Sequence, residues 1–202
     1  MPTSIENMFS CLSLQHKGRV KWGEKILDDK PGVYIVSVSS NPNEMINKHE
    51  NNPPIDLNIV RGWIQRVPTL TLNGKRPTPE ELKSRLSGFW LPDEPILYIG
   101  KTGTSLKDRV RQFYNTPLGD KRPHAGGHWL KTLSILKDLY VHWTITSRAE
   151  EFENNLIRLF VEGVSTSSRK ILADPQKPFP FANIEYPKGN KKKHDINKSV
   201  NR

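Results

Sequence analysis

Three side chains that suit a phosphate group fall within residues 96–114. Tyr98 belongs to a short apolar run typical of a strand, and Lys101 follows the glycine that ends this run. Arg109 lies on the next stretch, where apolar residues recur with the period of an amphipathic helix. A phenol, an ammonium and a guanidinium at one strand–helix junction are suited to binding phosphoryl oxygens.

Two further candidates come from other parts of the chain. Tyr34 lies in an apolar run typical of a strand, and Glu153 borders the apolar face of a predicted helix over residues 147–162. A single carboxylate suits Mg²⁺ when water and substrate phosphate complete the octahedron, whereas the simpler interpretation is an edge residue bonded to solvent or to Arg158. Tyr34 and Tyr98 are either core residues with hydrogen-bonded hydroxyls, or groups that act on water because nearby cations lower a phenol pKa.

A loop over residues 115–127 carries basic and polar side chains and ends in two glycines. His124 and His128 stand four residues apart, but the glycines between them argue against a helical metal site. We instead expect this region to contact phosphates or bases. The candidate contacts are Tyr114, Lys121, Arg122, His124 and His128.

The elements that must position these residues are strands and helices in irregular alternation. Strands are expected over residues 33–39, 96–99 and 139–147, with a further short one that includes Val20 and Trp22. Helices are expected over residues 4–14, 56–67, 78–88, 106–114, 128–137 and 147–162, two of them opened by capping boxes at Thr78 and Ser147. This order predicts an α+β fold with a small mixed or antiparallel sheet flanked by helices.

The composition favours an anionic partner. The 202 residues carry a net charge of +10, and residues 188–202 contain six Lys or Arg against one Asp, a net +5. Nucleic acid is favoured over an acidic membrane. The single cysteine, Cys11, excludes a disulfide framework and a thiolate metal site. Because the sequence has no apolar run long enough to span a bilayer and no signal-peptide pattern, we expect a cytoplasmic protein with no membrane partner, associated with the nucleoid if bacterial.

The order of the candidate residues resembles that of a known family. Gly32-Val33-Tyr34 and Tyr98-Ile99-Gly100 are similar to the two halves of the signature of the GIY-YIG nuclease superfamily. An Arg on the next helix (Arg109), a Glu on a later helix (Glu153) and an Asn in a closing loop (Asn183) follow in the same order. The matching segments cover more than half of the chain.

The resemblance implies a three-stranded antiparallel sheet and Mg²⁺- or Mn²⁺-dependent hydrolysis of DNA phosphodiester bonds. It assigns Tyr34 as the general base for the attacking water and Tyr98 as the group that orients water or phosphate. Arg109 would stabilise charge on the phosphoryl oxygens, and Glu153 would hold the single metal ion.

The resemblance also assigns supporting roles. Lys101 would lower a tyrosine pKa, and Asn183 would brace the site from the closing loop. The chain departs from many relatives four residues after the arginine, where they have His or Tyr and this chain has Phe113. Tyr114 or His128 could take that role.

The second departure concerns the domain organisation. We divide the chain into an N-terminal helical arm (1–30), a nuclease-like domain (31–187) and a basic, disordered tail (188–202). A large helical insertion, residues 40–95, separates the first two strands. It could recognise a DNA sequence, mediate dimerisation or act as a lid.

The expected function is a DNA endonuclease of the stand-alone or restriction–modification type, acting as a monomer or homodimer. One alternative is a catalytically decayed nucleic-acid-binding or regulatory protein on the same scaffold, which Phe113 favours. Another is a structure-specific repair nuclease, which would prefer branched or damaged DNA over intact duplex.

Overall fold

The computed structural model describes residues 4–45, 52–120, 122–124 and 126–198. Its central sheet has four strands in the order β1-β5-β2-β4, and every neighbouring pair is antiparallel. The strands are β1 (Gly18–Lys21), β2 (Gly32–Ser37), β4 (Ile96–Thr102) and β5 (Tyr140–Ile145). The α+β class is confirmed. The expected three-stranded sheet gains β1 as a fourth strand at its edge, so this part of the predicted N-terminal arm belongs to the sheet.

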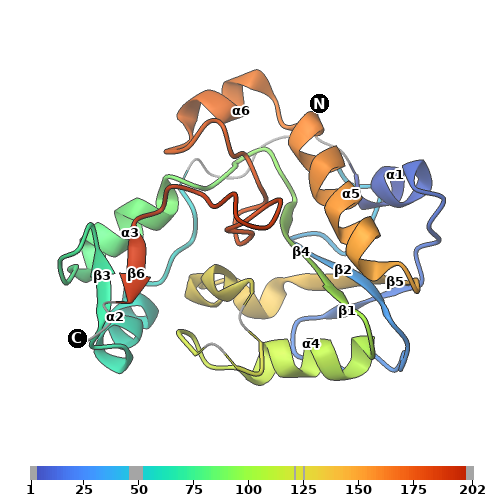
Figure 1. Ribbon diagram of the computed structural model, residues 1–202, viewed down its shortest axis with the longest axis horizontal. Coiled ribbons are helices and arrows are strands. Elements are labelled where there is room, and N and C mark those ends of the chain that lie inside the picture. The colour runs from blue at the N-terminus through green and yellow to red at the C-terminus, as the bar shows by residue number, and fades with distance from the viewer. Residues whose placement is uncertain (1–3, 46–51, 121, 125, 199–202) are drawn as a thin grey trace.

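Side chains of β2 alternate between two hydrophobic cores, one on each face of the sheet. Tyr34 lies in the core that includes apolar side chains of α4 (Leu106–Asn115). Ile35 lies in the other core, with side chains of α1 (Ile5–Cys11) and α5 (Ala149–Gly163). Figure 1 shows α4 on one side of the sheet and α5 on the other. A strand covered on both faces is buried throughout, and β2 is.

The insertion folds against one end of the sheet (Figure 1). It contains α2 (Leu57–Arg66), β3 (Leu70–Leu72) and α3 (Pro79–Ser87). The predicted capping box at Thr78 is confirmed, because its hydroxyl accepts from the Glu81 amide and the Glu81 carboxylate accepts from the Thr78 amide. Apolar side chains of α2 and α3 lie in the same core as Tyr34, so the insertion is packed onto the domain.

The C-terminal segment, defined here as residues 188–198, is ordered. Its strand β6 (Ile196–Lys198) pairs antiparallel with β3 of the insertion, and Lys192 is buried. The prediction of a disordered tail is therefore wrong up to residue 198, because composition alone does not register pairing with a strand more than 120 residues earlier. Residues 199–202 lie outside the described part of the chain.

Three helix predictions differ from the structure. Residues 128–138 form two short 3₁₀-helices, η1 (His128–Thr132) and η2 (Leu136–Asp138), in place of one α-helix. The predicted capping box at Ser147 does not form, because α5 begins at Ala149 and has no side-chain cap. A further helix, α6 (Thr166–Ile171), lies where the sequence predicted no helix or strand. Within the described residues, no helix is long and apolar enough to cross a bilayer.

Candidate active site

Four of the predicted site residues meet at the end of β4, between α4 and α5. Two hollows of about 410 Å³ and 360 Å³ open there, and both are lined by Tyr98, Lys101 and Glu153. The larger hollow continues along α5 to residues 182–188, and the smaller continues along α4 to Arg109. These four side chains, predicted from the sequence, thus border one connected region.

Tyr34 lies behind this region, with no exposed surface. Its Cα is paired across the sheet with Gly100, and its ring centroid lies 6.0 Å from that of Tyr98. A Cβ on Gly100 would come within 2.8 Å of the Tyr34 hydroxyl and the Tyr98 ring. Glycine at this position therefore lets the two phenols approach each other across the strand pair.

His124 supplies an imidazole that the sequence placed in a different role. Its Nε2 lies 2.9 Å from the Tyr34 hydroxyl, and its ring is stacked on Phe113 with centroids 4.2 Å apart. The loop thus places an imidazole against the apolar ring of Phe113, which α4 contributes. The nucleic-acid contact predicted for His124 is disfavoured, because the residue is fully buried.

Burial is the main cause of the pKa shifts of Tyr34, Tyr98 and His124. It raises the pKa of Tyr34 and of Tyr98 above the usual phenol value, and Arg109 offsets this only in part. The expectation that nearby cations lower a phenol pKa is therefore wrong for this structure, because desolvation outweighs the charge of Arg109. Burial, and then the charge of Arg109, lower the pKa of His124 to about 3, so its imidazole is neutral at pH 7 and is a weak base there.

Glu153 projects from α5 toward Lys101. Oε2 of Glu153 lies 3.3 Å from Nζ of Lys101, and the same ammonium lies 3.0 Å from Oε1 of Glu150 one turn earlier. Burial raises the pKa of Glu153, and Lys101 opposes this shift. Glu150, which is exposed, was not among the predicted residues; its spacing of three from Glu153 on one helix was the available signal.

Arg109 borders the smaller hollow with Thr102, Thr104 and Gln112. One guanidinium nitrogen lies 3.4 Å from the Pro123 carbonyl, at the long end for a hydrogen bond. Its Nε is buried and has no hydrogen-bond partner within the described residues. A half-buried guanidinium with spare donors beside polar hydroxyl and amide groups is suited to an anion such as phosphate.

Asn183 acts on the backbone of β4. Its side-chain oxygen accepts from the Ile99 amide at 2.9 Å, and its side-chain nitrogen donates to the Ile99 carbonyl at 2.8 Å. Ile99 stands between Tyr98 and Gly100, so this pair of hydrogen bonds holds the backbone of β4 next to both residues.

The other predicted contacts are not brought to the hollows. Tyr114 packs against Trp22, with ring centroids 4.8 Å apart, and lines a different pocket beside Gly23. His128 donates to the His124 carbonyl at 2.8 Å and accepts from the Gly119 amide at 3.2 Å, so it shapes the loop that presents His124. The expectation that Tyr114 or His128 takes part in the site is therefore not supported, because neither side chain lines the two hollows.

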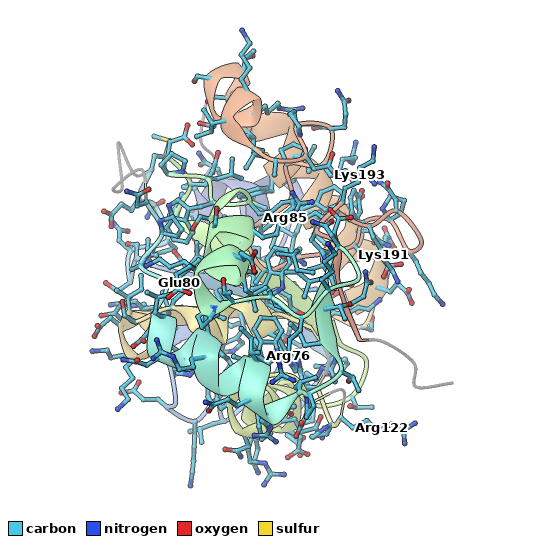
Figure 2. The ribbon with its side chains drawn as sticks, turned by 90° about the vertical axis from the view of Figure 1, so that its left-hand side faces the viewer. Arg76, Glu80, Arg85, Arg122, Lys191 and Lys193 are labelled. Atoms are coloured by element: carbon cyan, nitrogen blue, oxygen red, sulfur yellow. The ribbon has the colours of Figure 1, made fainter. Side chains whose placement is uncertain are left out.

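The remaining two contacts predicted in this loop are basic. Arg122 is exposed and projects from the surface (Figure 2). Lys121 lies outside the described residues, so its predicted contact stays a prediction.

The carboxylate of Glu153, beside an open hollow, suits one hard divalent cation. Within the described residues, no group of three or more His, Cys, Asp or Glu side chains converges as a closed metal site. A single carboxylate beside an open hollow instead suits Mg²⁺, which keeps several waters and takes substrate phosphate as a ligand. The comparisons with known proteins found no matching family model, no matching curated protein and no matching solved structure.

Proposed function

We propose that the protein is a divalent-metal-dependent DNA endonuclease of the GIY-YIG type. One observation carries this proposal: Tyr98, Lys101, Arg109 and Glu153 line two adjoining hollows, with Tyr34 buried directly behind them. This set combines a carboxylate that suits a metal ion, two cations that suit a phosphate group, and phenols that can hydrogen-bond to water. It occurs in the order that the family resemblance assigns.

In the proposed reaction, Arg109 and Lys101 bind the phosphoryl oxygens of the scissile phosphodiester. Tyr98, which borders both hollows, orients the attacking water. Glu153 would hold the divalent ion, which polarises the phosphate when bound. The water oxygen forms a bond to phosphorus, and the bond from phosphorus to the leaving sugar oxygen breaks.

The proton of the attacking water passes to solvent water in the open hollow, because burial raises both phenol pKa values and lowers that of His124 to about 3, so none of these groups is a strong base at pH 7. The Tyr34 hydroxyl lies 2.9 Å from Nε2 of His124, and this buried pair supports the ring of Tyr98 that orients the water. The leaving alkoxide takes a proton from solvent.

The alternative is a catalytically decayed nucleic-acid-binding protein on the same scaffold. Two observations favour it: Tyr34 has no exposed surface, and the carboxylate of Glu153 is already paired with Lys101. A metal ion at Glu153 would compete with this ammonium. The two functions make opposite predictions for catalysis while sharing salt-sensitive DNA binding.

Cleavage by the wild-type protein distinguishes these functions. Supercoiled plasmid, a short intact duplex and branched duplexes are incubated with the protein in Mg²⁺, in Mn²⁺ and in EDTA. We expect metal-dependent cleavage of intact duplex with discrete ends. Preferential cleavage of branched DNA would instead indicate the repair-type nuclease. Binding without cleavage of any substrate, in either metal, would contradict the proposed function and favour the decayed scaffold.

A further inference from the structure

A buried lysine joins the C-terminal segment to the closing loop of the candidate active site. Lys192 is only 3% exposed. Its Nζ donates to the carbonyl oxygens of Pro180 at 2.9 Å and Phe181 at 3.0 Å. The same nitrogen lies 5.5 Å from the ring centroid of Phe89 and 5.4 Å from that of Trp129. The amine is thus enclosed by two carbonyls and two aromatic faces.

The two carbonyls belong to the turn that carries Asn183. The Asn183 amide donates to the Pro180 carbonyl at 2.9 Å, so the turn is closed on the same oxygen that Lys192 binds. The Asn183 side chain then makes its two hydrogen bonds to Ile99. A continuous series of hydrogen bonds therefore leads from Lys192 to the strand residue next to Tyr98.

The insertion holds Lys192 in place from the other side. Arg85 of α3 donates to the His194 carbonyl at 3.0 Å, and it also contacts the Lys193 carbonyl and the Asp195 carboxylate. Figure 2 shows Arg85 and Lys193 side by side at the contact between α3 and the C-terminal segment. The Lys192 amide donates to the Ile184 carbonyl at 2.8 Å, just beyond Asn183.

Packing alone does not account for a lysine at this position. Removing an amine from water is costly unless hydrogen bonds replace its hydration. An apolar side chain of similar length would fill the same space between Phe89 and Trp129 without that cost. Only the amine can donate hydrogen bonds to the two carbonyls that precede Asn183. The specific contribution of Lys192 is thus to fix the conformation of this turn.

We propose that Lys192 is a positioning residue of the candidate active site, which holds the Asn183 turn so that β4 keeps Tyr98 and Lys101 in place at the hollows. The insertion and the C-terminal segment then have a shared task in addition to any DNA contact, because they must be docked on the domain for efficient cleavage. The catalytic part of this inference rests on the proposed nuclease function.

The test compares Lys192→Met with Lys193→Met. Methionine keeps the length of lysine and removes the amine, and Lys193 is the exposed neighbour on the same segment. The first readout is hydrogen exchange of the Ile99 amide by NMR, which needs no activity. We expect exchange roughly 10-fold faster in Lys192→Met, with the Ile35 amide of β2 unchanged and Lys193→Met like wild type.

The second readout separates positioning from binding. We expect kcat for plasmid cleavage to fall roughly 10- to 100-fold in Lys192→Met, with KM for DNA within twofold of wild type. If Lys192→Met does not fold by circular dichroism, Arg85→Met releases the same segment from the surface and should shift both readouts in the same direction. Ile99 exchange and kcat within twofold of wild type in the folded variant would overturn the proposal.

The two readouts also separate failure of this inference from failure of the proposed function. Wild-type protein that does not cleave DNA removes the kinetic readout, and faster Ile99 exchange in Lys192→Met would still establish the hydrogen-bond route to β4. Unchanged Ile99 exchange alongside active wild-type enzyme would contradict the positioning role alone.

Discussion

The Tyr34 hydroxyl lies 2.9 Å from Nε2 of His124, a residue 90 positions later in the chain. This contact joins the first half of the signature to a loop that the sequence did not connect with it. Stacking on Phe113 and the hydrogen bond from His128 to the His124 carbonyl fix the imidazole. The geometry gives the buried phenol a neutral hydrogen-bonding partner.

Removing the Tyr34 hydroxyl should therefore impair cleavage more than it impairs folding. Tyr34→Phe keeps the ring in its core and removes the atom that contacts His124. We expect kcat to fall roughly 10- to 100-fold, because the hydroxyl helps to position Tyr98, while the Kd for DNA stays within twofold. The measurement is single-turnover cleavage of a labelled duplex.

Tyr114→Phe is the matched control for Tyr34→Phe. It removes a phenol hydroxyl near the end of the neighbouring helix α4, away from both hollows. Cleavage by this variant should match wild type. Equal activity of Tyr34→Phe and wild type would exclude a role of the Tyr34 hydroxyl in cleavage.

Cleavage should require the planar guanidinium of Arg109 with its several hydrogen-bond donors, and not only its positive charge. Arg109→Lys retains the charge but loses the fork that can bind two phosphoryl oxygens. We expect kcat to fall roughly 10- to 100-fold. Arg111→Lys, on the same helix in an exposed ion pair with Asp108, should leave kcat unchanged. An unchanged kcat in Arg109→Lys would show that the positive charge alone is enough and would contradict a contact that needs the guanidinium.

The strands and helices that form the site were readable from the sequence because their patterns are local. The runs around Tyr34 and Tyr98 are short and apolar, and the helix carrying Arg109 has a clear amphipathic period. Four side chains that line the hollows follow from motif order. Glu153 was found by its place beside an apolar face.

What the sequence missed depends on long-range contacts. The pairing of β6 with β3 and the enclosure of Lys192 join segments that no local pattern relates. His124 was seen only as a basic-loop residue, because stacking on Phe113 has no spacing signature. The sequence predicted that nearby cations lower a phenol pKa, whereas burial raises the pKa of Tyr34 and of Tyr98. Burial results from tertiary packing, which no local pattern reveals.

His124 should make the protein sensitive to acid. Its pKa in the fold is about 3, below the ordinary value of 6.5, so the unfolded chain binds the proton more readily. The stability due to the neutral imidazole is complete above pH 6.5 and is lost as pH falls toward 3. The His124→Gln variant has no group at this position that binds a proton in this pH range. In urea titrations, its loss of unfolding free energy between pH 7 and pH 5 should be about 2 kcal/mol smaller than that of wild type. An identical loss in both proteins would contradict the assignment.

Glu94 should lower the stability of the protein at alkaline pH, whereas His124 lowers it at acid pH. It is 2% exposed, and burial followed by the charge of Asp93 raises its pKa to about 8. A carboxyl whose pKa is raised in the fold contributes full stability below pH 4.5 and loses it as pH rises toward 8. Glu94→Gln should therefore be more stable than wild type at pH 9, by a few kcal/mol at roughly 1.4 kcal/mol for each pKa unit.

Urea titrations at pH 5 and pH 9 measure this difference. Glu80→Gln, an exposed substitution on α3, is the control and should leave the pH dependence unchanged. A Glu94→Gln protein that loses as much stability as wild type between the two pH values would show that Glu94 is not the responsible group.

The role of Glu153 is tested most directly by the metal dependence of cleavage, measured for Glu153→Gln beside Glu151→Gln. Both residues lie on α5, but Glu153 faces Lys101 at the hollows, whereas Glu151 forms an exposed ion pair with Arg148. In Mg²⁺, we expect wild type and Glu151→Gln to cleave duplex DNA at the same rate. Glu153→Gln should lose at least roughly 10²-fold in kcat with DNA binding retained. Cleavage by Glu153→Gln at the wild-type rate and with the same Mg²⁺ dependence would contradict the assignment of Glu153 as the metal ligand.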